Sequence, residues 1–166
     1  DIYDIYKLDD NNYRIFIADS EGHGVQAALT IMIVKTEYDK IKLFGLPPNQ
    51  ILHILNTTYI RQYKKLESYF TCAILDINIK KRSISYASGG HPEQIFIHND
   101  KINHVKTDGP LIGLKEDSLF DLKTYTFKKG DKFFLYTDGI VEIINENYQI
   151  FGLRGLGEIL INDLHK

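Results

Sequence analysis

The chain has no tryptophan and a single cysteine among its 166 residues. One cysteine can form neither an internal disulfide nor a cysteine zinc cluster, so neither cross-link stabilises the fold. Cys72 lies in an apolar segment, where a free cysteine usually packs as a small hydrophobic residue. We therefore expect Cys72 to be buried. The scarcity of cysteine is typical of a reducing compartment such as the cytoplasm.

Long apolar runs and an excess of charge of one sign are also missing. No apolar run approaches the about 20 residues of a membrane-spanning helix, and no signal segment opens the chain. Lys and Arg number 20 and Asp and Glu number 22, which gives a formal net charge of −2. This balance provides no general attraction to nucleic acid or to an anionic membrane. We expect a cytoplasmic segment that contacts neither, within a longer protein that could still carry a membrane anchor.

The length and composition are those of one ordinary globular domain. Hydrophobic residues make up 43% of the chain and charged residues 25%, which is close to average globular usage. The chain begins with Asp1 rather than methionine. We therefore expect residues 1–166 to form a single domain, truncated at its N-terminus and excised from a longer regulatory protein.

The apolar periodicity predicts an α+β fold. Val25, Leu29, Met32 and Thr36 are spaced three or four residues apart, which predicts a helix from residue 25 to about 45, and Pro47-Pro48 precedes a second helix that includes Tyr59. A third helix is predicted over 153–164. Strands are predicted over 2–8, 13–19, 69–76, 83–87, 94–98, 102–105, 122–127 and 132–136. We expect hairpins between the first two and between the last two strands. Helices and strands are segregated along the chain, which favours antiparallel sheets.

Carboxylates stand where apolar strands end. Asp19 and Asp138 each follow an apolar strand and precede a glycine turn, and a hairpin would place Asp1 beside Asp19. Three converging carboxylates repel one another unless a cation compensates them. Their hard oxygen atoms favour Mg²⁺ or Mn²⁺, and two such ions about 4 Å apart can activate water for attack on a phosphoryl group. The alternative for each single residue is ordinary turn chemistry.

A dinucleotide-binding site is a second alternative. The segment from Gly22 to Ala27 fits the G-x-G-x-x-G/A fingerprint between a strand and a helix. However, Asp19 and Glu21 would place negative charge against a pyrophosphate. The predicted second helix also follows where a parallel strand should return.

Six ordered motifs resemble those of the SpoIIE/RsbU-type serine phosphatases, a bacterial branch of the PPM (type 2C) metal-dependent protein phosphatases. The matching segments cover nearly the whole chain: Asp1-Ile2-Tyr3-Asp4, Ile17-Ala18-Asp19 through Gly22-His23-Gly24 with Ala27-Ala28, Tyr69-Phe70-Thr71, Gly89-Gly90-His91-Pro92, Asp108-Gly109-Pro110-Leu111-Ile112-Gly113-Leu114, and Gly130-Asp131 with Tyr136-Thr137-Asp138-Gly139-Ile140-Val141-Glu142.

The resemblance implies two stacked antiparallel β-sheets flanked by helices, and removal of phosphate from phosphoserine or phosphothreonine by a metal-bound hydroxide. It implies two ions, Mn²⁺ or Mg²⁺, a phosphorylated STAS-type anti-anti-sigma protein as substrate, an upstream sensor in the same chain and a possible homodimer. The implied ligands are Asp1, Asp19, Asp138 and the backbone carbonyl of Ser20, with His23 as a candidate proton donor. A degenerate, inactive fold that binds a STAS partner is the alternative.

Several other polar residues have competing interpretations. Glu142 could hold a metal through water or cap the turn, with neither favoured. For His91 a structural turn is favoured over a substrate contact, and Asp4, on the opposite strand face from Asp1, is expected to be structural. The remaining histidines lack ligand spacing and are expected at the surface or in packing: His53, His98, His104 and His165.

Overall fold

The computed structural model describes residues 1–164, which form two compact units. The first comprises Asp1–His91 and Lys106–Phe127; the second comprises Pro92–Val105 and the chain from Lys128 onward. Each unit contains an antiparallel sheet and at least one helix, so the predicted α+β class is confirmed. His165 lies outside the described residues.

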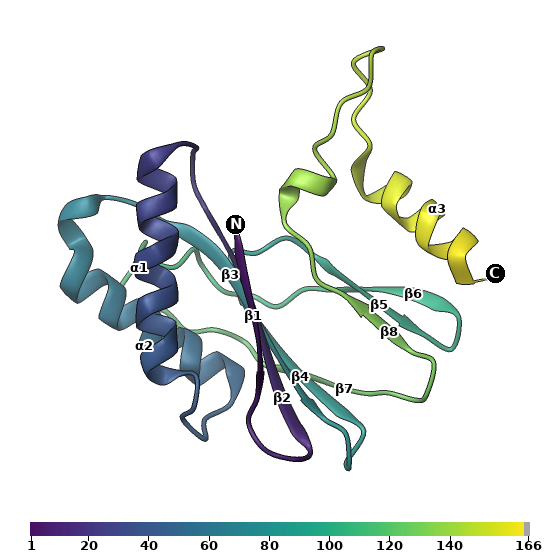
Figure 1. Cartoon of the computed structure of the whole chain (residues 1–166), viewed down its shortest axis with the longest axis horizontal. Helices are drawn as coiled ribbons and strands as arrows, with labels where there is room; N and C mark the ends of the chain where they lie inside the picture. Colours follow the sequence, from purple (N-terminus) through teal and green to yellow (C-terminus); the bar gives the residue numbers. More distant parts are fainter. Residues whose placement is uncertain (165–166) are drawn as a thin grey trace. The chain divides into compact units, whose positions relative to one another are not determined.

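The first unit is built on a five-stranded antiparallel sheet in the order β1-β2-β3-β4-β7 (Figure 1). Its strands are β1 (Ile2–Lys7), β2 (Asn12–Ser20), β3 (Phe70–Asn78), β4 (Ser83–Gly89) and β7 (Lys123–Thr126). The carboxylate of Asp9 accepts hydrogen bonds from the backbone N–H groups of Asn11 and Asn12, which closes the β1–β2 turn. The hairpin predicted for the first two strands is therefore confirmed.

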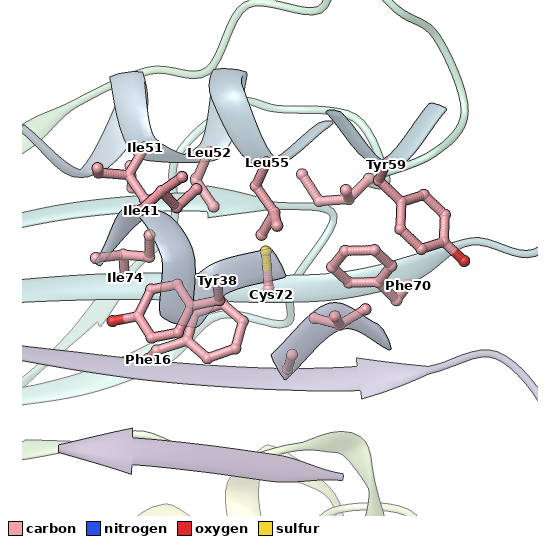
Figure 2. Close-up of a cluster of buried hydrophobic side chains, with 14 of the residues drawn as sticks. Phe16, Tyr38, Ile41, Ile51, Leu52, Leu55, Tyr59, Phe70, Cys72 and Ile74 are labelled. Carbon is pink, nitrogen blue, oxygen red and sulfur yellow. The ribbon is translucent and has the colours of Figure 1, made fainter. Parts of the chain in front are cut away.

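Two helices cover one face of this sheet (Figure 1): α1 (Val25–Ile41) and α2 (Pro48–Tyr63), the latter followed by the short helix η1 (Lys64–Leu66). Pro48 occupies the first turn of α2, where its missing N–H costs nothing. Figure 2 shows side chains from both helices meeting those of β2 and β3, with Phe16 stacked on Tyr38 at a centroid distance of 4.0 Å. Cys72 lies fully buried in this core, as predicted.

The apolar stripe that predicted α1 does not face the core. Val25, Leu29 and Met32 are 77%, 61% and 60% exposed, whereas Val34 and Tyr38 are completely buried. The helix carries apolar residues on two sides, and the stripe that includes Val34 and Tyr38 packs on the sheet. Helix α1 is therefore confirmed, but its most regular apolar spacing marks its exposed face.

A buried arginine attaches the α1–α2 loop to the sheet. The Arg14 side chain, 1% exposed, donates from Nε and Nη2 to the two carboxylate oxygens of Asp76 at 2.7 and 2.6 Å. Its remaining N–H groups reach the backbone carbonyls of Lys42, Phe44 and Leu46 at 3.0, 3.4 and 2.6 Å. Arg14 therefore ties β2 and β3 to the loop between α1 and α2.

The second unit has a three-stranded antiparallel sheet in the order β6-β5-β8. Its elements are β5 (Gln94–His98), β6 (Lys101–Val105), β8 (Lys132–Phe134), the short helix η2 (Asp138–Ile140) and α3 (Gly152–Leu164). Leu156 and Leu160 of α3 pack against Ile95 and Ile97 of β5. Among the described residues, no helix combines the length and the apolar character needed to cross a bilayer.

The hairpin predicted around Lys128-Lys129-Gly130-Asp131 is wrong. Strand β7 pairs with β4, and β8 pairs with β5, so the two strands join different sheets. The turn has partners of its own: the Asp131 carboxylate accepts from the Lys128 backbone N–H at 2.6 Å and lies 2.7 Å from Nδ1 of His98 in β5. This contact attaches the turn to β5, and it agrees with the surface or packing position expected for His98.

Candidate metal centre

In the first unit, Asp1 and Asp19 lie side by side at one end of the sheet. The β1–β2 register pairs Ile2 with Ala18, which brings Asp1 opposite Asp19. The α-amino group of Asp1 lies 3.8 Å from Oδ1 of Asp19, and the two side chains are 58% and 21% exposed. The predicted proximity of the two residues is therefore confirmed.

Thr71 and His91 lie next to Asp19 on its other side, away from Asp1. Thr71 is the β3 partner of Asp19, so the two side chains share one sheet face. Oγ1 of Thr71 lies 2.9 Å from Nδ1 of His91, whose side chain is buried. The adjacent Gly90 has a φ of 62° and bridges to Cys72, which turns the loop toward β3. These contacts agree with the structural role favoured for His91.

The turn after β2 carries the next predicted site residues. Ser20 still pairs with β3, and its hydroxyl donates to the carbonyl of Ala27 at 3.3 Å. Gly22 and Gly24 adopt φ values of 84° and 80°, which suit glycine. Between them, His23 is exposed to solvent.

The dinucleotide-binding alternative does not agree with this topology. After the turn and the two helices, the chain returns as β3, which pairs with β2 in antiparallel orientation. A dinucleotide fingerprint requires a parallel βαβ unit. The glycines of this turn therefore belong to a strand-to-helix reversal beside Asp19.

Asp4, the other acidic residue of the N-terminal motif, forms ion pairs with Lys35 and Lys42. Asp4, on the helix-facing side of β1, lies 2.9 Å from Nζ of Lys42 and 3.4 Å from Nζ of Lys35. The structural role predicted for Asp4 is confirmed, since Asp4 joins β1 to Lys35 within α1 and to Lys42 just after the end of α1.

In the second unit, Asp138 stands where the chain leaves β8. It opens η2, and its backbone carbonyl accepts from the N–H groups of Val141 and Glu142, both at 2.9 Å. The Asp138 and Glu142 side chains are both exposed. The turn therefore presents both carboxylates to solvent, and Asp138 follows β8, which ends at Phe134, two residues earlier than predicted.

Gln94 is a residue that the sequence reasoning missed. It is completely buried, and its side-chain amide exchanges two hydrogen bonds with the backbone of Tyr136, at 3.1 Å to the carbonyl and 2.7 Å from the N–H. Burial, with a smaller contribution from the charge of Glu93, raises the pKa of the Tyr136 phenol to about 12. A glutamine at the start of the apolar run Ile95-Phe96-Ile97 was the available signal.

The sequence matches the profile of the family described as Stage II sporulation protein E (SpoIIE) over residues 9–166. The chain belongs to the SpoIIE family. Among curated proteins it is 32% identical over 152 residues to the phosphoserine phosphatase RsbU of Bacillus subtilis, a match covering 89% of this chain and 44% of RsbU. The chain thus spans less than half of that relative. The resemblance inferred from the six motifs is confirmed.

Solved structures share this SpoIIE-family fold. The SiaA-PP2C domain of Pseudomonas aeruginosa superposes with a TM-score of 0.84 and 21% identity, covering 96% of this chain and 64% of that one. RsbX in complex with magnesium superposes with a TM-score of 0.66 and 22% identity, covering 84% and 66% of the two chains. At these identities the likeness establishes the PP2C phosphatase fold alone.

The predicted ligands of this SpoIIE-family chain are divided between the two units. Asp1, Asp19 and Ser20 belong to the first, and Asp138 and Glu142 to the second. Within either unit, no three His, Cys, Asp or Glu side chains of the described residues gather into a metal-binding group. All five predicted donors are oxygen atoms, which suits Mg²⁺ or Mn²⁺.

Proposed function

We propose that this chain is a metal-dependent protein serine/threonine phosphatase domain. The observation that carries the proposal is the adjacency of Asp1 and Asp19, enforced by the β1–β2 register, in a chain whose family match covers residues 9–166. The register sets two aspartates side by side at one end of the sheet, and carboxylate oxygens are ligands that Mg²⁺ and Mn²⁺ take.

The proposed ligands are Asp1, Asp19, Asp138 and the backbone carbonyl of Ser20, with Glu142 acting through water, for two Mn²⁺ or Mg²⁺ ions. The magnesium complex of the structural neighbour RsbX supports this choice of metal. When bound, such ions lower the pKa of a coordinated water and neutralise charge on a phosphoryl group. Phosphoryl transfer requires mostly positioning and electrostatic stabilisation from the protein.

The chain's own residues fit direct hydrolysis better than a covalent phosphoenzyme. Cys72 is completely buried, and burial raises the pKa of its thiol far above the usual range, so it is no nucleophile. The Ser20 hydroxyl is engaged with the Ala27 carbonyl. His23 is exposed between two glycines, so its imidazole is accessible to a leaving group and is the proposed proton donor.

The proposed substrate is a phosphorylated STAS-type anti-anti-sigma protein, with an upstream sensor domain in the same longer chain and a second copy as a possible partner. The relative RsbU, named a phosphoserine phosphatase, supports a phosphoserine substrate. The family resemblance supports the STAS class.

The test is release of phosphate from a phosphoserine-containing STAS protein by the 166-residue chain, with Mn²⁺, with Mg²⁺ and with excess EDTA. Metal-dependent release that EDTA abolishes is expected. Asp19→Asn serves as the matched control, since it removes one ligand charge at nearly constant shape. Binding of the phosphoprotein without turnover would favour the inactive binding module, and full activity in EDTA would exclude the metal mechanism.

A further inference from the structure

Gln94 is completely buried, yet every polar atom of its side chain has a backbone partner. Nε2 donates to the carbonyls of Pro92, Glu93 and Tyr136 at 2.9, 3.3 and 3.1 Å, and Oε1 accepts from the Tyr136 N–H at 2.7 Å. All of these groups belong to the second unit. A buried amide satisfied in this way holds its neighbours in one geometry.

Where the backbone pairing between β5 and β8 ends, the Gln94 side chain continues it by exchanging two hydrogen bonds with the backbone of Tyr136. Strands β5 and β8 pair regularly from Ile97↔Lys132 to Ile95↔Phe134, where β8 ends. The Gln94 side chain then takes both backbone groups of Tyr136, as a strand neighbour would. The chain therefore remains attached to the sheet for two residues beyond β8, as far as Tyr136.

This attachment ends two positions before Asp138. Asp138 is the first residue of η2, and its backbone carbonyl accepts the hydrogen bonds that close this short helix. The Asp138 side chain is exposed, so little packing holds it in place. The backbone direction of Asp138 is thus set by a rigid Tyr136 on one side and by η2 on the other. Hydrogen bonds from Gln94 hold the backbone of Tyr136 in place, and its ring is held by packing among Ile95, Ile97 and Leu156.

We propose that Gln94 is a positioning residue that fixes where Asp138 is presented at the end of β8. This inference rests on the proposed function, in which Asp138 binds the metal. Gln94 touches no reacting atom; it acts through the backbone of Tyr136. Partners that orient a metal ligand typically contribute about 10- to 100-fold to metal affinity.

The experiment compares Mn²⁺ affinity, by calorimetric titration of the full 166-residue chain, between the unaltered protein and Gln94→Met. Methionine keeps the length and volume of the side chain and removes its hydrogen bonds. We expect affinity to fall about tenfold and amide exchange at Tyr136 to accelerate. Gln50→Met, an exposed glutamine of α2, is the chemical control and should bind as the unaltered chain does.

A second control separates positioning from general loss of stability. Phe96→Ala removes a buried ring of the second unit that stacks on Phe133 and lies outside the cluster around Tyr136; it should lower the melting temperature at least as much, while the Gln94–Tyr136 pair stays intact. If Gln94 acts through Asp138, Gln94→Met should cause little further loss of affinity in an Asp138→Asn background.

The outcomes distinguish the inference from the function on which it rests. Unchanged Mn²⁺ affinity in Gln94→Met, with binding that still depends on Asp138, would overturn the positioning role and leave the proposed function standing. An equal loss of affinity in Phe96→Ala would overturn it as well. Absence of Mn²⁺ binding by the unaltered chain, or binding that ignores Asp138→Asn, would overturn the proposed function itself.

Discussion

The hydroxyl of Thr71 lies 2.9 Å from Nδ1 of His91, and Thr71 is the cross-strand partner of Asp19. The pair joins the loop after β4 to the start of β3, beside the predicted ligand Asp19. Because His91 is buried, loss of the hydrogen bond between Thr71 and Nδ1 is not made up by bulk water and costs about 1–3 kcal/mol.

We predict that Thr71→Val and His91→Ala each destabilise the first unit, and that the double variant is less destabilised than the sum of the two. The measurement is a double-mutant cycle by urea unfolding. Thr124→Val, at an exposed position of β7, is the matched control and should change stability by less than about 0.5 kcal/mol. Strict additivity would show that the hydrogen bond has no energetic role.

Replacing Arg14 should be far more costly. Arg14→Met leaves the Asp76 carboxylate and three loop carbonyls without the donors that now satisfy them. Breaking a buried pair by removing one partner costs about 3–5 kcal/mol. We expect a correspondingly large fall in the free energy of unfolding, measured by urea titration.

Arg154→Met is the matched control for Arg14→Met. Arg154 also pairs with an acidic residue, Glu158 at 2.9 Å, but its side chain is 92% exposed. An ion pair of this kind contributes little to stability. Comparable losses in the two variants would contradict the role assigned to Arg14.

Most elements of the fold could be predicted because local patterns determine them. The β1–β2 hairpin follows from Asp9 and the asparagines after it, whose hydrogen bonds form within the turn itself. The second helix follows from Pro48 at its first turn and the apolar spacing after it. These signals lie within a few residues of the structure they specify, so a single sequence contains them.

Features that depend on distant partners could not be predicted. Helix α1 has two apolar stripes, and only packing against Phe16 and its neighbours decides which one is buried. The strands on either side of Gly130 separate because Asp131 binds His98, which is 33 positions away. Gln94 likewise gains its role from Tyr136, 42 positions away.

The same distinction applies to the candidate site. The proximity of Asp1 and Asp19 could be predicted correctly, because the turn and the register of a hairpin determine which residues lie opposite each other. Asp138 lies in a different unit, so its assignment as a ligand rests on the motif and stays a prediction.

Stability should depend on pH through Glu37. Its side chain is buried, and burial alone would raise its pKa. However, the hydrogen bonds from Nζ of Lys40 and the hydroxyl of Tyr63, both 2.7 Å, outweigh burial and hold the pKa of Glu37 below its ordinary value of 4.5. A carboxyl with a lowered folded-state pKa contributes stability above its unfolded pKa and loses it as pH falls through the folded value.

We therefore predict that the stability contributed by Glu37 is fully present above pH 4.5 and declines below it. In Glu37→Gln this part of the pH dependence should disappear, because the amide does not titrate. The measurement is urea unfolding at several pH values between neutral and acidic. Glu158→Gln, at an exposed site, is the control and should show the same dependence of stability on pH as the unaltered chain. If Glu37→Gln also showed that dependence, the prediction would be contradicted.

The sharpest test of the proposed site is Asp138→Asn. The substitution removes one negative charge at nearly constant shape, and the Asp138 side chain is exposed, so the free energy of unfolding should change by less than about 0.5 kcal/mol. If Asp138 binds the metal, phosphate release should fall by more than about 100-fold, since even the partners of ligands contribute up to that amount. Phosphate release and thermal unfolding are measured on the same preparations. Asp100→Asn, in the turn between β5 and β6, supplies the matched exposed control and should retain activity. Unaltered turnover in Asp138→Asn would remove this residue from the site, whereas loss of turnover together with unfolding would mean that Asp138 holds the η2 turn rather than a metal.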